Sequence, residues 1–475
     1  MAVDTGPGGS RIQNWMEQAL ALSAADGCVV VGEERTEANL RWAANSLTTN
    51  GQMRSRKLTV ISMVDGPAGV SSGAASGPVT ADDPAGALAA LVAASEAAAH
   101  AAAPADDAAP LVSAGGTDPG WDCPPAGTGI EVFTDLAPAL GAAFGSAAAA
   151  GQLLYGFAEH VLTSNYLASS TGLRRRFDQP TGRFELNGKT ADLGSSAWIG
   201  CQTRDFRDID LPALTADLDR RLGWSRTKIE LPAGRYETLL PPSAVADLML
   251  IPYSEASARD AEEGRSVYSA AGGGTRLGES LAALPLTLRS DPSEPGLQCA
   301  PFVIASPGSE QSVFDSGAEV PAVDWISRGK LANLHRNRNW AARTGTAFVP
   351  MPDNLIMTAD GPDGAELPSL DQMIAGTERG LLLTCLWYIR QVDPQTLLVT
   401  GLTRDGVYLI ERGEVRGVVN NFRFNESPVD LLGRITEIGA TCPTLPREFS
   451  DEFTRAAMPP IRVSDFNMST VSQAS

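Results

Sequence analysis

Histidine, the residue type that most often holds catalytic zinc or carries protons near neutral pH, is scarce in this chain of 475 residues. The three histidines are His100, His160 and His335, and none has another histidine or a cysteine at helical or hairpin spacing. A metal site needs three or four ligands that converge on one point. We therefore predict that the chain binds no metal, and we interpret each histidine as a structural or surface residue.

Cysteine offers no clearer catalytic pattern. The six cysteines are widely separated along the chain and form no CxxC pair. Such scatter is typical of reduced, mostly buried thiols in a cytosolic protein, and it does not favour a disulfide framework or a zinc knuckle. We predict no catalytic residue, and we interpret Cys442 as a buried or capping cysteine.

The last third of the chain carries a predicted hairpin followed by a third strand. Val407 to Glu411 and Glu414 to Asn420 are short runs rich in β-branched or aromatic residues. Arg412-Gly413 between them favours a tight or bulged turn, because glycine accepts a positive φ. Asn421 to Asn425 follows as the third strand.

The alternation of side chains along this third strand predicts two different faces. Phe422 and Phe424 lie on one face, which we expect to join the core, and polar residues lie on the other. An extended peptide could add to such a sheet through backbone pairing. We predict peptide binding by five residues on or beside the strand: Arg404, Asp405, Arg423, Asn425 and Glu426. The alternative is a network of arginine and carboxylate that ties the sheet together.

The charge of the chain restricts its partners. The net charge is −19, and the longest basic cluster is Arg174-Arg175-Arg176. A phosphate backbone would be repelled, so we predict no binding to nucleic acid. The amino terminus has no apolar signal-peptide core, and the longest strongly apolar run, Leu381 to Ile389, is too short to span a bilayer. We predict no membrane association and a cytoplasmic location.

The length predicts more than one domain, because 475 residues exceed what one core usually supports. We expect an α+β fold with mixed or antiparallel sheets and flanking helices, in which an α/β amino-terminal region precedes a larger β-rich carboxy-terminal domain. The predicted boundaries are residues 1–104 for the amino-terminal α/β domain, 105–129 for a linker, 130–230 for a middle α+β domain and 231–475 for the carboxy-terminal domain.

Two local predictions depend on single residues. Asn50-Gly51 is predicted to form a turn between strands at Asn39 to Leu47 and Lys57 to Val64. Pro242 to Glu263 is predicted to form a helix with an apolar core face. Pro252 would interrupt this helix at its middle, because proline lacks the backbone donor and clashes with the preceding turn.

Several segments follow one another in an order that is familiar from one family. They are Thr36 to Leu47, Leu167 to Gly172, Gly401 to Gly406, Gly413-Glu414 and Asn421 to Pro428. In sequence and spacing they resemble the TldD/PmbA family, also called the TldD/TldE or modulator-of-gyrase family. The resemblance extends over nearly the whole chain.

This resemblance implies a difference in chemistry among family members. In metal-bearing members, the helix that corresponds to Pro242 to Glu263 carries an HExxxH motif, whose histidines bind the metal and whose glutamate is the general base. The matching segment here, Ala246 to Glu255, contains no histidine. Those members also use a cysteine near the carboxy terminus, and Cys442 lies in roughly that region without companion ligands. The resemblance therefore implies a metal-free, TldE/PmbA-like member.

The family also implies a function. We expect the chain to be the non-metal subunit of a cytosolic heterodimeric metallopeptidase that cleaves unfolded or leader peptides. A TldD-like partner with an HExxxH motif would hold zinc, while this chain would bind no cofactor, would enclose the peptide and would be inactive alone. Two alternatives stay open, namely a non-enzymatic peptide-binding or assembly protein and a stand-alone enzyme of altered chemistry that uses Cys442 or His335.

Overall fold

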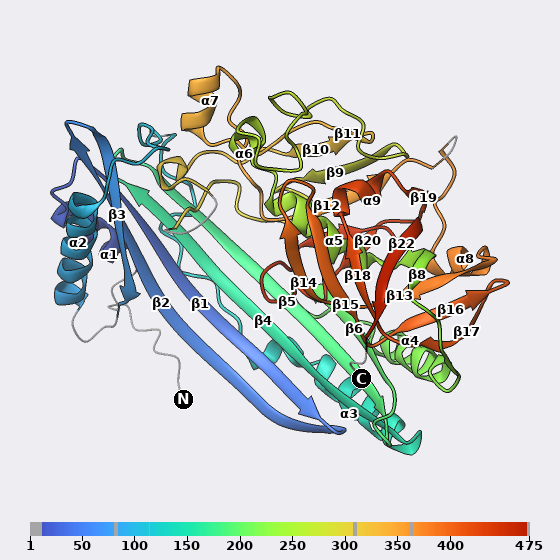
Figure 1. Ribbon diagram of the computed structural model, residues 1–475. Coiled ribbons are helices and arrows are strands. Elements are labelled where there is room, and N and C mark those ends of the chain that lie inside the picture. Colours follow the sequence, from blue (N-terminus) through green and yellow to red (C-terminus); the bar gives the residue numbers. More distant parts are fainter. Residues whose placement is uncertain (1–11, 80–83, 114, 307–310, 362–363, 473–475) are drawn as a thin grey trace.

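The computed structural model describes residues 12–79, 84–113, 115–306, 311–361 and 364–472. Three sheets and their flanking helices form two halves that lie side by side (Figure 1). One half is a long-stranded sheet with four helices, and the other contains two further sheets around a central helix. The fold is mixed α+β, which confirms the predicted class. Within these residues no helix is long and apolar enough to cross a membrane.

The first sheet is antiparallel and has the strand order β3-β2-β1-β4-β5-β6. Its strands come from both sides of the segment predicted as a linker, and β1 pairs with β4 over most of its length. The strands are β1 (Gly27–Ala43), β2 (Ser46–Gly66), β3 (Gly69–Pro78), β4 (Gln152–Ser169), β5 (Arg174–Thr190) and β6 (Ser196–Thr203).

The turn between β1 and β2 is not at Asn50-Gly51, as predicted, but at Ala44-Asn45. Both residues of this turn have a positive φ, 50° and 63°. Asn45 is fixed by the neighbouring strand, because its side-chain amide donates to the carbonyl of Gln152 at 2.8 Å and accepts from the amide of Leu154 at 2.7 Å. Tertiary hydrogen bonds thus favour the earlier turn, and Asn50-Gly51 continues the strand.

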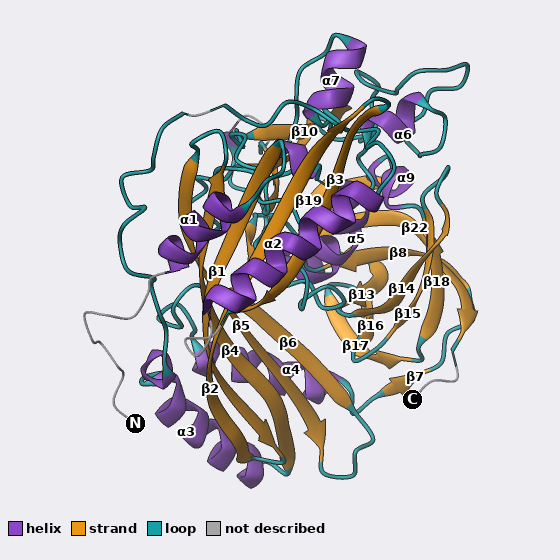
Figure 2. Ribbon diagram, turned by 90° about the vertical axis from the view of Figure 1, so that its left-hand side faces the viewer, coloured by secondary structure: helices purple, strands orange, loops and turns teal. Residues whose placement is uncertain are grey.

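Four helices cover one face of the first sheet. Alternate residues of β1 point to this face, from Val30 at one end to Trp42 at the other, and join two apolar clusters with the helices. Figure 2 shows α2 crossing the strands of this sheet. The helices are α1 (Ile12–Leu22), α2 (Pro84–Ala101), α3 (Leu136–Ala149) and α4 (Leu211–Trp224), and η1 (Ile130–Phe133) precedes α3.

The opposite face of the first sheet is polar in its middle and turns toward the carboxy-terminal half. Arg35 on β1, Thr163 on β4 and Gln179 on β5 lie on this face, in neighbouring register positions. Period-two geometry thus separates an apolar face under the helices from a polar face that is available to form a site.

A ten-stranded sheet dominates the carboxy-terminal half, with the path β14-β15-β18-β22-β8-β13-β16-β17-β7 and β19 paired to β22. It contains most of the strands that follow residue 370 and two that precede them. The strands are β7 (Lys228–Ile229), β8 (Gly234–Leu240), β13 (Arg379–Leu383), β14 (Leu386–Asp393), β15 (Leu398–Thr403), β16 (Val407–Glu411), β17 (Glu414–Val419), β18 (Phe422–Glu426), β19 (Ile435–Ile438) and β22 (Ile461–Val471).

A smaller sheet, in the order β11-β10-β9-β12-β21-β20, completes this half. Its strands are β9 (Leu286–Ser290), β10 (Val323–Ser327), β11 (Lys330–Leu331), β12 (Leu355–Ala359), β20 (Cys442–Thr444) and β21 (Ala456–Met458). The remaining helices are α5 (Pro242–Ser254), α6 (Ala258–Glu262), η2 (Val313–Asp315), α7 (Arg338–Thr344), α8 (Leu370–Ala375) and α9 (Pro428–Leu432).

Helix α5 joins a single large core with both sheets of the carboxy-terminal half. The helix ends at Ser254, so the prediction of one helix to Glu263 is wrong. Pro252 stays inside the last turn, and the chain leaves the helix two residues later. A new helix, α6, then begins after Ser257, whose side chain accepts from the amide of Asp260.

The predicted hairpin is confirmed. Strands β16 and β17 pair antiparallel around Arg412-Gly413, both with positive φ. The next strand, β18, does not extend this hairpin but lies between β15 and β22. Its predicted core face is also confirmed, since Phe422 and Phe424 are both fully buried.

The two faces of β18 predict a large loss of stability for a substitution on one face and almost no change on the other. Phe424 lies with its ring 5.7 Å from the ring of Phe466 and directly over Gly401. We expect Phe424→Ala to lower the free energy of unfolding by about 3–5 kcal/mol, because it leaves a cavity in the core. The matched control is Arg423→Ala on the exposed face, with an expected change within about 0.5 kcal/mol. Equal losses in chemical denaturation would contradict this packing.

Candidate functional site

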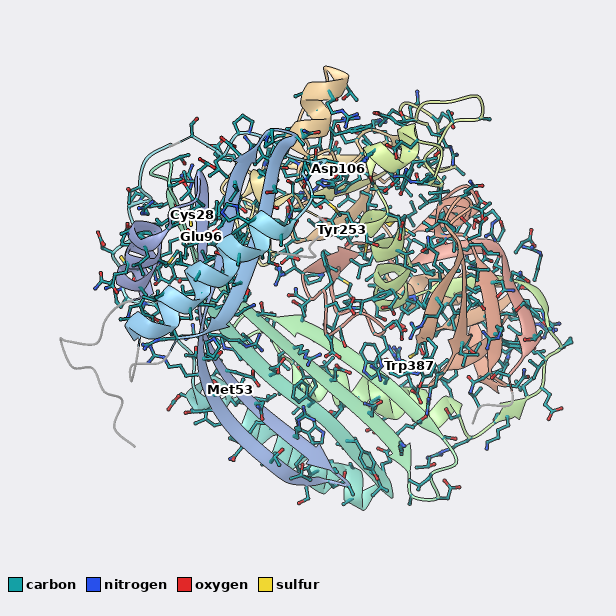
Figure 3. The ribbon with its side chains drawn as sticks, turned by 60° about the vertical axis from the view of Figure 1, so that its left-hand side comes forward. Cys28, Met53, Glu96, Asp106, Tyr253 and Trp387 are labelled. Atoms are coloured by element: carbon teal, nitrogen blue, oxygen red, sulfur yellow. The ribbon has the colours of Figure 1, made fainter. Side chains whose placement is uncertain are left out.

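A cavity of about 820 Å³ lies between the polar face of the first sheet and helix α5, and we call it the central cavity. Asn165 on β4 and Gln179 on β5 contribute to its sheet wall, while Leu250, Ile251 and Tyr253 contribute from α5. In Figure 3, Tyr253 lies between the first sheet and the sheets of the carboxy-terminal half. The central cavity is thus formed where the two halves of the molecule meet.

The wall of the central cavity is mainly apolar. Its apolar residues come from α5 and from loops of the carboxy-terminal half: Leu250, Ile251, Tyr253, Ala300, Phe302, Ile304, Val320, Met351, Pro352, Phe449 and Phe453. Its two charged residues are Asp353 and Glu452. Asp353 forms an ion pair with Arg455, whereas no cation in the described ranges lies within ion-pair distance of Glu452.

Two smaller cavities adjoin the central cavity, one at each side. A polar cavity of about 200 Å³ shares Glu452 with it, and a cavity of about 550 Å³ shares Phe302 and Val320. We call the three together the groove. The groove runs along β4 and β5, and its middle is apolar while the smaller cavity that shares Glu452 is lined mostly by charged and hydroxyl side chains.

A buried carboxylate fixes the turn that forms one side of the groove. Asp247 on α5 is fully buried and accepts hydrogen bonds from the backbone amides of Arg447 at 3.1 Å and Glu448 at 2.8 Å. Burial raises the pKa of Asp247 to about 8, although these hydrogen bonds act in the opposite direction. We call Arg447 to Phe449 the held turn.

Each side chain of the held turn makes a different contact. The Arg447 guanidinium lies 5.2 Å from the ring of Trp198 on β6 and 4.2 Å from the ring of Trp387 on β14. Glu448 accepts from the backbone amide of Ile389 on β14 at 3.1 Å, and Phe449 lines the central cavity. Figure 3 shows Trp387 where the carboxy-terminal half approaches the first sheet. The held turn therefore joins both halves of the molecule and shapes the cavity at once.

The residues of α5 do not fit a metal ion. Asp247 is the one residue of α5 whose side chain is of a type that commonly binds metal ions. Its carboxyl group already accepts hydrogen bonds from backbone amides. The adjacent Leu248 and Met249 are fully buried. Across the described ranges, no group of three or more histidine, cysteine, aspartate or glutamate side chains is placed to hold a metal ion.

The histidines lie on separate segments of the structure, and two of them make hydrogen bonds. His160 on β4 donates from Nε2 to the carbonyl of Arg204 at 2.6 Å, and burial lowers its pKa. Nδ1 of His335 lies 2.9 Å from the carbonyl oxygen of Val349. His100 is exposed on α2. Cys442 lies on β20 with its side chain exposed, so the predicted buried or capping position is wrong; partial desolvation by the surrounding chain still raises the pKa of its thiol.

The five residues predicted to bind peptide fall into two groups. Arg404 and Asp405 lie in the connection between β15 and β16, where Ser196 of the first sheet donates a hydrogen bond to Asp405. Arg423, Asn425 and Glu426 lie on β18, which is paired on both sides. A peptide could reach that group only through side chains.

Within the β18 group, exposure differs strongly. Arg423 is exposed, and its guanidinium donates to Thr400 Oγ1 at 3.2 Å. Glu426 is only 3% exposed, forms an ion pair with Arg434 and accepts from the amide of Asn467 at 2.6 Å. Peptide binding by these residues stays a prediction. Sequence reasoning missed Asp247, the held turn and the central cavity, because no local motif marks them.

Comparison with known proteins places the chain in a family. A family model described as the PmbA/TldA metallopeptidase C-terminal domain matches residues 233–470. No curated protein matches the chain. Together with the fold, the model defines a metallopeptidase-like α+β protein. The chain belongs to the PmbA/TldD family, which confirms the family predicted from its motifs.

Solved structures share the fold over almost the whole chain at 15% identity. TldE from Thermococcus kodakarensis has a TM-score of 0.75 and covers 96% of this chain and 99% of its own. A putative modulator of DNA gyrase from Thermotoga maritima has a TM-score of 0.72 and the same coverage. Another, from Bacteroides thetaiotaomicron, has a TM-score of 0.70 and covers 97% of this chain and 98% of its own.

The buried carboxyl group of Asp247 predicts a measurable pH dependence. Its pKa is raised in the folded chain, so the folded state holds this proton more tightly than the unfolded state does. Its contribution to the free energy of unfolding therefore falls as the pH rises from about 4, the ordinary value, toward 8, and is constant above that range. Asp247→Asn removes this titration.

The measurement is the free energy of unfolding of both proteins between pH 4 and 9, taken as a difference. We expect the stability of the wild-type chain relative to Asp247→Asn to decline with rising pH. Asp291→Asn is the control, because hydrogen bonds from Ser293 hold the pKa of Asp291 below its usual value, so this group titrates below the measured range and its stability difference should stay nearly constant. Parallel stability curves for wild type and Asp247→Asn would contradict the assignment.

Proposed function

We propose that this chain is the non-metal subunit of a two-subunit cytoplasmic metallopeptidase, in which it encloses an extended peptide and positions it at the metal of a partner. The partner would be a TldD-like relative with an HExxxH motif and bound zinc. The single observation that carries the proposal is helix α5, which offers no histidine and commits its only carboxylate to the held turn. On this proposal the chain cleaves no peptide alone.

The groove supports a role in peptide handling. It lies along the polar face of the first sheet, and the side-chain amide of Asn165 in its wall makes no hydrogen bond within the described ranges. A free amide can pair with the backbone of a peptide of any sequence. We therefore propose unfolded peptides, including leader peptides, as the substrates, because their backbone can pair with this amide and the backbone of a folded protein is already paired.

A stand-alone enzyme has less support. A nucleophilic cysteine needs a lowered pKa, whereas partial desolvation raises the pKa of the exposed Cys442. His335 is engaged with the carbonyl of Val349. A binding protein without any partner is distinguished from the proposed subunit by the experiment below.

The test is coexpression of the chain with an HExxxH-bearing relative from the same genome, followed by native mass measurement and a peptide-cleavage assay. We expect a complex of the two chains whose cleavage of an unfolded peptide stops on addition of a chelator and returns with zinc. Each chain alone, and a complex whose partner has one HExxxH histidine replaced by alanine, are the controls and should show little or no cleavage.

Two results would contradict the proposal. One is chelator-sensitive cleavage by the isolated chain, together with a stoichiometric metal found by elemental analysis. The other is failure of the chain to associate with any HExxxH-bearing relative of its own genome under conditions where both are folded.

A further inference from the structure

We propose that the central cavity binds a bulky apolar side chain of an extended peptide, and that Glu452 binds a cationic group which the peptide carries close to that side chain. This inference rests on the proposed function, because it takes the ligand to be the peptide that the complex processes. It adds a substrate preference that would be set by the subunit without metal.

The dimensions and lining of the cavity favour an apolar group. Its volume of about 820 Å³ lies in the range of ligand-binding cavities in proteins, about 300–1,000 Å³. Phe302, Met351 and Phe453 line it from three separate segments, together with Leu250 and Ile251 of α5. An aromatic or branched aliphatic side chain would remove this apolar surface from water, which is favourable in proportion to the area covered.

Polar groups on the sheet wall favour a peptide over a purely apolar ligand. Gln179 Nε2 donates to the carbonyls of Pro180 at 3.0 Å and Gln298 at 3.2 Å, so its amide is held in place by the protein. The side-chain amide of Asn165 has no hydrogen-bond partner in the described ranges, and it can both donate and accept. The amides of Gln179 and Asn165 can pair with the backbone of a peptide, while the apolar cavity beside them can hold one of its side chains.

The charges around Glu452 favour a cation on the ligand. Three arginines line the adjoining polar cavity, and each has a carboxylate of its own: Arg35 with Glu37, Arg183 with Glu159 and Arg455 with Asp353. Glu452 lines both cavities and forms no ion pair with a described residue. Glu452 is exposed, so a lysine or arginine side chain of the peptide, or its free amino terminus, could pair with its carboxylate at the boundary between the cavities.

The test measures peptide affinity of the full chain alone by calorimetry. The probe is acetyl-Gly-Gly-Phe-Gly-Lys-Gly-amide, in which Phe and Lys are two positions apart because alternate side chains of an extended chain share a face. Replacing Phe by Ala should raise Kd at least tenfold, and replacing Lys by norleucine should raise it about threefold or more. A norleucine peptide with a free amino terminus distinguishes a terminal ammonium from a side-chain cation.

Variants of the protein locate the two effects. Ala300→Trp fills the cavity and should raise Kd for the Phe peptide at least tenfold while leaving Kd for the Ala peptide unchanged. Ser254→Trp, on another part of the wall, serves if Ala300→Trp does not fold. Glu452→Gln should weaken the Lys peptide but not the norleucine peptide, and Glu414→Gln, on β17 away from the groove, should weaken neither.

Equal affinity for the Phe and Ala peptides, or no measurable binding of any peptide, would overturn the inference. An unchanged preference for the Lys peptide in Glu452→Gln would overturn the role of Glu452. These outcomes are separate from the test of the proposed function, because complex formation and metal-dependent cleavage are measured with the partner present. A complex that cleaves peptide without this preference would leave the function intact and remove only the inference.

Discussion

The structure depends on one buried carboxyl group. Asp247 on α5 accepts hydrogen bonds from two consecutive backbone amides of the held turn, Arg447 to Phe449. A polar group that is fully buried is strongly destabilising unless it is paired, so both the carboxylate and the amides require this geometry. Because α5 packs in the main core, the held turn is fixed relative to that core. The same interaction positions Phe449 in the wall of the groove.

The three residues of the held turn contact the first sheet, the ten-stranded sheet and the central cavity. Arg447 lies between Trp198 of the first sheet and Trp387 of the ten-stranded sheet, and such cation–π contacts are strongest where water is excluded. Glu448 caps backbone amides of β14, and Phe449 forms part of the cavity wall. The relative position of the two halves and the lining of the groove are therefore coupled through this turn.

Helix α5 packs in the main core and holds the turn at Arg447 to Phe449. Its side chains are apolar and buried around Leu248 and Met249, and its carboxylate binds backbone. The neighbouring cavity has correspondingly an apolar wall with one carboxylate that forms no ion pair, Glu452. The chemistry of this part of the molecule therefore suits recognition of a ligand with an apolar group.

The sequence by itself determined the α+β class, the family, the hairpin at Arg412-Gly413 and the core face of β18, because glycine turn chemistry and period-two alternation are local. It also determined that α5 lacks histidine. Only the tertiary structure decided the turn at Ala44-Asn45, where β4 fixes Asn45, and the held turn, whose partners are about 200 residues apart. Hydrogen bonds between residues so far apart along the chain form only when the core packs, so the spacing of residues in the sequence does not predict them.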